Sequence, residues 1–319
     1  MNYYIGIDIG GTKIAQALIR HDGKIFGRTK VSTPKGAPPR EIYAAVLKSL
    51  EQLLKEAQLP KSKIKGIGLA VPGIVDTHKH RILAAPNIRL AGYALNQRLR
   101  RKFRVPVVMV NDVNAGLLGE AWLGAAKGLK HVAGIFPGTG VGGAAIIDGK
   151  LLLGLQGAAT EFGHIIVSPA GPLCHCGNYG CLEALASRWA IERDIRQLLK
   201  SGQKSVIVQL TNGKLSTIKS RILKEALKRN DKVVKSVLTK ASVILGKAAI
   251  SLNHIFNPQA ILFGGGLIKG CGHFMLPIVQ KSLKADPFFK KFNSCRILQS
   301  KLGDDAVPLG AVRLLQARK

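Results

Sequence analysis

The sequence predicts an α/β protein made of two similar domains with a ligand cleft between them. Strands and amphipathic helices alternate along the chain, which is the pattern of α/β layers. A segment near the N-terminus also reappears in altered form in the middle of the chain, which indicates a duplicated domain. The two domains would join near residues 113–119. A length of 319 residues allows each of them a substantial core.

The repeated segment is a glycine turn between two strands. In the first copy, residues 6–12 lead into apolar residues 15–19 and a turn at 22–24. In the second, residues 134–140 lead into 143–147 and a turn at 148–150. Glycine lets backbone amides approach an anion closely because no Cβ intervenes. Two such turns facing each other would hold a chain of phosphates, although each could be an ordinary hairpin that needs glycine.

The other elements follow from apolar periodicity. Helical spacing of apolar residues predicts an amphipathic helix over residues 41–57. Apolar runs bounded by turn residues predict three buried strands, at 64–71, 105–110 and 260–263. Four further helices are expected, at 182–200, 220–229, 232–255 and 306–316.

The charge of the chain is strongly positive. Lys and Arg number 48 against 18 Asp and Glu, a net charge of +30, which would attract nucleic acid, anionic membranes or other polyanions. One cluster comprises Arg98, Arg100, Arg101, Lys102 and Arg104, but the remaining lysines are scattered, and aromatic residues that stack on bases make up only 5%. We expect a charge that serves solubility, with nucleic acid an unlikely partner and a functional polyanion site the alternative.

No apolar run is long enough to cross a bilayer, and no signal peptide opens the chain. These features predict a soluble, cytoplasmic protein without a membrane partner.

Three of the five cysteines, Cys174, Cys176 and Cys181, lie within eight residues. Zinc prefers four nitrogen or sulfur ligands in a tetrahedron, and three close thiolates interrupted by glycines supply three of them. We expect a histidine as the fourth, either His164 or His175. His164 is favoured because His175 lies inside the Cys-x-Cys step, where its neighbours hinder a simultaneous bond. The alternative is three free thiols.

A second candidate site follows the strand at 105–110. This strand ends by presenting Asn111 and Asp112 at the carboxyl edge of a sheet, where α/β proteins bind ligands. An aspartate there can take a proton from a substrate hydroxyl. On these residues alone, Asp112 could equally cap the following helix.

Five motifs occur together and in order: residues 8–13 (Asp-Ile-Gly-Gly-Thr-Lys), 110–115, 138–143, 161–164 and 174–183. In this combination the sequence resembles the ROK family of sugar kinases and sugar-responsive repressors, especially its glucokinase-like members, over nearly the whole chain. The resemblance implies an α/β fold of the actin-like ATPase (ribonuclease H-like, hexokinase-type) class, duplicated into two domains with ATP in the cleft. The domains would comprise residues 1–114 with a C-terminal helix at about 305–319, and residues 115–304 with a zinc loop.

The resemblance also implies a role for each motif residue. Asp112 would be the catalytic base that takes the proton from the 6-hydroxyl of a hexose, most simply glucose. Asp8 would orient Mg²⁺ through water. The sugar would be bound by Gly73, Asn87, Asn111, Glu161, His164 and Glu183. The phosphates of ATP would be held by Gly10, Gly11, Thr12, Lys13, Gly138, Thr139 and Gly140, with Gly265 and Gly266 beside the adenosine. A structural Zn²⁺ would be bound by His164, Cys174, Cys176 and Cys181.

Other readings stay open. Kinases of N-acetylmannosamine or N-acetylglucosamine in this family share the same motifs, and polyphosphate is an alternative donor. A regulator of the family would carry a helix-turn-helix domain first, whereas here the first glycine hairpin begins at Ile5. A scaffold without catalysis is a further alternative. The resemblance suggests a homodimer. Thr160 stands where relatives commonly carry Gly.

Overall fold

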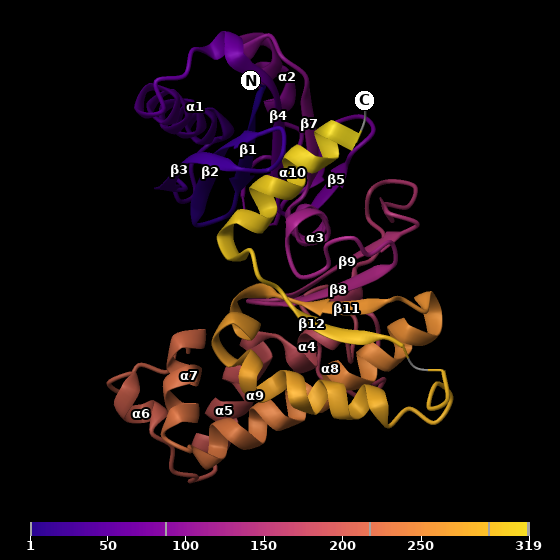
Figure 1. The fold of residues 1–319 in the computed structure, drawn as a ribbon. Helices are drawn as coiled ribbons and strands as arrows, with labels where there is room; N and C mark the ends of the chain where they lie inside the picture. Colours follow the sequence, from indigo (N-terminus) through magenta and orange to yellow (C-terminus); the bar gives the residue numbers. More distant parts are fainter. Residues whose placement is uncertain (1, 87, 217, 293, 318–319) are drawn as a thin grey trace. The chain divides into compact units, whose positions relative to one another are not determined.

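The computed structural model describes residues 2–86, 88–216, 218–292 and 294–317, which form two compact units (Figure 1). The first unit comprises Met1–Leu129, Ala145–Thr160 and Lys301–Lys319. The second comprises Lys130–Ala144 and Glu161–Ser300. Compared with the boundaries expected from the sequence, residues 115–129 and 145–160 lie with the first unit. Helix α3 (Asp112–Leu123) belongs there because it packs on α10 (Ala306–Ala317).

The first unit is built on a five-stranded sheet of order β3-β2-β1-β4-β7. Its strands are β1 (Tyr3–Ile9), β2 (Lys13–Arg20), β3 (Ile25–Ser32), β4 (Ile64–Val71) and β7 (Val107–Asn111). The first three are antiparallel, and β4 and β7 run parallel to β1. A separate small hairpin joins β5 (Ile74–Asp76) and β6 (Arg81–Ala84).

The two faces of this sheet bury different helices, because side chains alternate along a strand. Ile5, Ile7 and Ile9 of β1 belong to a core shared with α1 (Pro39–Glu56) and α2 (Leu95–Phe103). On the other face Tyr4 packs with the apolar residues of α10.

Helix α10 lies directly against the backbone of the sheet and of α3 (Figure 1). A Cβ added at Gly6 would lie 2.3 Å from the carbonyl oxygen of Pro308, and one at Gly68 would lie 2.3 Å from Ala311. At the α3 contact, a Cβ on Gly119 would lie 2.1 Å from the Ala306 carbonyl oxygen. Glycine is therefore required wherever α10 crosses these elements.

A second five-stranded sheet, most of which lies in the second unit, repeats the order of the first. Its order is β10-β9-β8-β11-β12, so three consecutive strands are again followed by two later ones. The strands are β8 (Val132–Pro137), β9 (Val141–Ile147), β10 (Lys150–Leu151), β11 (Ala260–Phe263) and β12 (Arg296–Gln299). Strand β11 pairs in parallel with β8 and β12. The repeat inferred from the two glycine segments is thus confirmed as a repeat of strand order.

The helices of the second unit are α4 (Leu182–Ala186), α5 (Arg188–Lys200), α6 (Ile207–Leu210), α7 (Ser220–Lys228), α8 (Lys232–Phe256) and α9 (Gly265–Lys284). The expected single helix over 182–200 was wrong. It is broken at Ser187, whose extended backbone starts α5 and whose Oγ accepts from the Ala190 amide at 3.2 Å. The other predicted helices and strands are confirmed within about two residues. The helices α2, α6 and α9 and the strands β5, β6 and β12 were not foreseen. Short 3₁₀ turns lie at Lys61–Lys63, Phe162–His164 and Gly303–Asp305.

Within the described residues, no helix combines the length and apolar character needed to span a membrane.

Candidate active site

The first glycine turn joins β1 to β2 and is held closed by its own backbone. The Gly10 amide donates to the Lys13 carbonyl at 2.8 Å. Thr33, which follows β3, donates its hydroxyl to the Gly10 carbonyl at 2.6 Å and its amide to the Thr12 carbonyl at 3.1 Å. The amides of Gly11 and Thr12 make no hydrogen bond within the part of the chain that the structure describes. They are donors available to an anion.

Two carboxylates lie at the carboxyl edge of the same sheet. Asp8 of β1 is in register with Ala70 of β4, which is in register with Val110 of β7, and Asp112 follows two residues later. The pKa of Asp8 is raised to about 7, first by burial and then by the negative charge of Asp112. Burial also raises the pKa of Asp112. Neither carboxylate makes an ion pair with another residue that the structure describes, and a pair of desolvated carboxylates of this kind suits a hard divalent cation such as Mg²⁺.

Lys13, at the end of the first turn, is held by an acidic residue to which the sequence analysis assigned no role. Asp304 Oδ2 lies 3.1 Å from Lys13 Nζ and 3.0 Å from Lys30 Nζ. These two ammonium groups, Lys30 first, lower the pKa of Asp304 to about 2. The signal in the sequence was the Gly303-Asp304-Asp305 turn, but its partners lie at the other end of the chain.

Asn111 and not Asp112 caps helix α3. Its Oδ1 accepts from the amides of Val113 at 2.8 Å and Asn114 at 3.1 Å, and its Nδ2 donates to the Gly73 carbonyl at 2.9 Å. Asp112 is the first residue of the helix and accepts from the Val113 amide at 2.9 Å. The side chain of Asn111 therefore fixes the backbone that presents Asp112.

Gly73 has a structural requirement of its own. Its φ is 94°, and a Cβ there would lie 2.1 Å from the Ala84 carbonyl oxygen. No other residue fits this turn between β4 and β5 without a backbone shift. Asn87, the remaining sugar-binding candidate of the first unit, lies outside the described residues.

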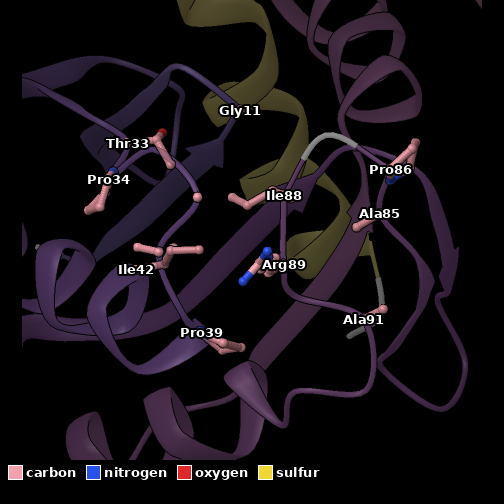
Figure 2. A pocket seen from close by; sticks show the side chains of 12 residues that line it. Gly11, Thr33, Pro34, Pro39, Ile42, Ala85, Pro86, Ile88, Arg89 and Ala91 are labelled. Carbon is pink, nitrogen blue, oxygen red and sulfur yellow. The ribbon is translucent and has the colours of Figure 1, made fainter.

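A cavity of about 510 Å³ adjoins the first glycine turn. Figure 2 shows its walls, with Thr33 and Pro34 on one side and Ala85, Pro86, Ile88 and Ala91 on the other. Gly11 lies at its edge, and the nitrogen atoms of Arg89 point into the space between the walls. Its volume falls in the usual range of small-molecule sites.

In the second unit, the turn at 138–140 joins β8 to β9. The Gly138 amide donates to the Gly140 carbonyl at 2.8 Å. Arg188, the first residue of α5, donates its amide to the Gly138 carbonyl at 2.9 Å and its guanidinium to Thr139 Oγ1 at 2.8 Å. Arg188 thus positions this turn. Sequence reasoning missed it because no motif links it to a turn so far away along the chain.

Glu183 of α4 connects this turn to the cysteine loop. Its Oε2 accepts from the Val141 amide at 2.9 Å, and its Oε1 lies 4.0 Å from Cys174 Sγ. A Cβ on Gly140 would lie 2.2 Å from Glu183 Oε2, so this contact requires glycine. At least one carboxylate oxygen of Glu183 is engaged by the protein itself.

The cysteine loop brings four candidate zinc ligands together. Atoms of His164, Cys174, Cys176 and Cys181 all lie within 4.8 Å of one another. Cys174 Sγ is 3.8 Å from the Nδ1 of His164, and the sulfurs of Cys176 and Cys181 are 3.6 Å apart. A zinc tetrahedron with Zn–S bonds of about 2.3 Å has edges of about 3.7 Å, so the four residues fit this metal. His175 lies outside the cluster and stacks on Trp189, with ring centroids 4.5 Å apart.

The remaining candidates lie beside the second glycine turn and the cysteine loop. Gly265 opens α9 with a φ of 81°, and a Cβ there would lie 2.6 Å from the Pro137 carbonyl oxygen, whereas Gly266 borders open space. Glu161 is exposed and directly precedes the 3₁₀ turn that contains His164, whose amide donates to the Glu161 carbonyl at 2.9 Å.

Each unit therefore gathers its own set of predicted residues. The first unit holds the two aspartates, the first glycine turn, Asn111 and Gly73. The second holds the other glycine turn, the zinc ligands, Glu161, Glu183 and the glycines of α9. The assigned role of each residue stays a prediction.

The sequence matches the model of the ROK family over residues 4–318. The chain belongs to the ROK family. A glucokinase of Thermotoga maritima is 30% identical over 316 residues, which cover 98% of this chain and 97% of the relative. A xylose repressor of Caldicellulosiruptor bescii is also 30% identical, and its match covers 98% of this chain and 77% of the repressor.

Among solved structures, a ROK family glucokinase from Streptomyces griseus in complex with glucose and AMPPNP superimposes with a TM-score of 0.83 at 32% identity, covering 98% of this chain and 99% of that one. This ROK chain therefore has the actin-like ATPase fold, which confirms the fold class expected from the sequence.

Proposed function

We propose that this ROK protein transfers the γ-phosphoryl group of ATP to the 6-hydroxyl of a hexose, with glucose as the leading substrate. The observation that carries the proposal is the placement of Asp112. It is the first residue of α3, its backbone is fixed by Asn111, and it lies beside the desolvated Asp8. The glucokinase relatives cover nearly the whole chain and support the same reaction.

Asp112 would act as the general base. Burial raises the pKa of its carboxyl toward the range in which a carboxylate accepts a proton from a hydroxyl during attack on phosphorus. The hydrogen bond from the Val113 amide opposes this rise and orients one carboxylate oxygen. Phosphoryl transfer requires mainly alignment and charge neutralisation, so a fixed base and fixed phosphate contacts are what the protein has to supply.

The two glycine turns are the proposed phosphate contacts. In the first unit the amides of Gly11 and Thr12 are available, and Lys13 adds a positive charge that Asp304 holds in place. Mg²⁺, oriented through water by Asp8, would neutralise the phosphate charge during transfer. In the second unit Arg188 fixes the turn around Thr139.

Zinc would have a structural role in this mechanism. The four ligands would hold the loop that leads into α4 and thereby place Glu183 and the ring of His164. The Nδ1 atom of His164 faces the cysteine sulfurs, which leaves its Nε2 atom as the nitrogen that a sugar hydroxyl would contact. The roles of Glu161, His164 and Glu183 toward the sugar are part of the proposal.

The decisive experiment measures ADP release from ATP·Mg²⁺ by zinc-replete protein. Glucose, N-acetylglucosamine, N-acetylmannosamine and mannose are compared in parallel. We expect glucose to give the highest kcat/KM and Asp112→Asn to lose at least 10³-fold in kcat, on the order expected for removal of a general base. If ADP release is highest with an N-acetylhexosamine, the proposed phosphoryl transfer stands, and that sugar replaces glucose as the proposed substrate.

The match to a xylose repressor supports a second candidate, a sugar-responsive regulator without turnover. It predicts sugar binding by calorimetry together with no ADP release from any sugar. The kinase proposal fails if folded, zinc-loaded protein gives that result.

A further inference from the structure

A basic groove lies at the edge of the first sheet opposite to the two aspartates. Asp8 and Asp112 lie at the carboxyl ends of their strands, whereas the groove contains Lys65 and Val107, at the amino ends of β4 and β7. Strand β4 has eight residues, so about 25 Å of extended chain separates its two ends. The groove has a volume of about 1040 Å³ and belongs entirely to the first unit.

Cationic side chains from three segments of the chain line this groove. They are Lys65, Lys79, Arg100, Arg101 and Arg104. All five are exposed, and none makes an ion pair with any residue in the described ranges. No acidic residue lines the groove. Asp76 is close in the chain, but its Oδ1 already accepts from the amides of His78 and Lys79.

Helix electrostatics alone do not explain this arrangement. Arg100 and Arg101 lie in the last turn of α2, where positive charge is favoured by the helix dipole. Lys65 and Lys79 come from β4 and from the turn between β5 and β6, which this dipole does not reach. Nearby cationic side chains do form ion pairs with carboxylates, as in the 3.3 Å contact between Lys102 Nζ and Glu51 Oε1 on the neighbouring surface.

The walls and floor of the groove select among polyanions. Its floor is formed by the buried Val107, Val108 and Leu315, and its polar wall includes Asn96 and Gln97. No Phe, Tyr or Trp lines it, and the one aromatic ring in its lining is that of His80, whose Nδ1 accepts from the Met109 amide at 3.3 Å. Successive bases of a single-stranded nucleic acid would therefore find no row of stacking surfaces. A flexible chain of linked phosphates needs only cations and hydrogen-bond donors along a groove.

We propose that this groove binds inorganic polyphosphate, separately from the phosphoryl-transfer site. The five cations would neutralise roughly one phosphate each. Arg104 would be held for this purpose by its left-handed backbone (φ 55°) at the end of α2, where its amide donates to the Arg100 carbonyl at 2.8 Å. The net charge of +30 would add long-range attraction for the chain.

The test is calorimetric titration of the full chain with inorganic polyphosphate, with ADP·Mg²⁺ present to occupy the nucleotide contacts, at rising KCl concentrations. The triple variant Arg100→Gln, Arg101→Gln, Arg104→Gln should bind at least tenfold more weakly. Its slope of log K against log salt should be shallower by about 2, from about 0.7 for each lost phosphate contact. The matched variant Lys281→Gln, Lys284→Gln, Lys290→Gln removes the same charge from the second unit and should stay within about twofold of the parent.

Equal losses of affinity for polyphosphate in both triple variants would overturn the proposal, because binding would then depend on net charge alone and not on this groove. Absence of binding to the parent would also overturn it. Single-stranded DNA of equal charge is titrated in the same way. If it binds as tightly and depends equally on the three arginines, the polyphosphate proposal is overturned and the groove is assigned to nucleic acid. Sugar-dependent ADP release should be unchanged in the arginine variant, so the fate of this proposal is independent of that of the kinase.

Discussion

The carboxylate of Glu183 accepts a hydrogen bond from the backbone amide of Val141 at 2.9 Å and closes over Gly140. This contact joins the helix that follows the cysteine loop to the turn proposed to hold phosphate. One side chain thereby makes the geometry of the turn depend on the geometry of the loop.

Removal of this contact should weaken nucleotide binding. In Glu183→Ala the Val141 amide loses an ionised acceptor, a bond worth about 1.5–3 kcal/mol, so KM for ATP should rise roughly 10- to 100-fold. Gly140→Ala should reproduce the effect because its Cβ would displace the carboxylate. Glu225→Gln, on the exposed surface of α7, serves as the control in steady-state assays. An unchanged KM in both site variants would show that the contact does not set the turn.

Stability should fall as pH rises through the titration range of Asp8. The pKa of Asp8 is about 7 in the folded protein against 3.8 as the ordinary value, so the folded state binds this proton more tightly than the unfolded state. The contribution of Asp8 to stability is therefore greatest below its ordinary pKa and decreases up to about pH 7, by as much as about 4 kcal/mol. Thermal unfolding of zinc-loaded protein in buffer without Mg²⁺ or chelator should give a lower Tm at pH 8 than at pH 5.5.

Asp8→Asn should flatten this dependence and raise Tm at pH 8. Asp22→Asn should leave the slope unchanged, because the hydrogen bond to Arg20 lowers the pKa of Asp22 and keeps it ionised throughout this range. A parent protein whose Tm rises from pH 5.5 to pH 8 would contradict the proposed cost of ionising Asp8.

Zinc removal should unfold the cysteine loop. The purified protein should contain one Zn²⁺ per chain by elemental analysis, and a chelator should lower Tm by at least 5 °C, because structural zinc contributes directly to folding. Cys181→Ser should abolish the bound zinc, whereas replacement of Cys295, which lies outside the cluster, by Ser should retain it. Full metal content in Cys181→Ser would exclude the proposed ligand set.

Thr160 should be replaceable by glycine with a gain in stability. Its φ of 67° places a β-branched residue in the left-handed region, which costs about 1–2 kcal/mol. Glycine removes this cost, but its greater conformational freedom in the unfolded state offsets part of the gain. We expect Thr160→Gly to raise the free energy of unfolding by about 0.5–1 kcal/mol in urea titrations. Thr211→Gly, at a φ of −107°, removes a hydroxyl bond to the Ile207 carbonyl and should destabilise instead.

Local patterns in the sequence were sufficient for most elements and for the motif residues. Strands β4 and β11 were predicted to the residue because each is a short apolar run between breaking residues. Helix α9 was missed because it opens with glycines and contains Pro277, which weaken a helical pattern until tertiary contacts compensate. The break at Ser187 was missed because helical spacing continues on both sides of it.

The contacts that fix the site were beyond the reach of local patterns. Asp304 meets Lys13, and Arg188 meets Thr139, only after the chain has folded. Each partner is an ordinary surface residue type, so spacing along the chain contains no sign of the pairing. Motif residues identify the chemistry, whereas these positioning residues become visible only with coordinates.

The glycines under helix α10 also have a consequence for the order of folding during synthesis. Gly6 and Gly68 lie in strands made early, yet the backbone that covers them, at Pro308 and Ala311, is made some 240 residues or more later. When synthesis has reached residue 300, all residues of the second unit have been made, but one apolar face of the first sheet is still exposed because α10 has not been made. The part of the protein translated first would be the last to close, and until then a chaperone would find its binding surface there.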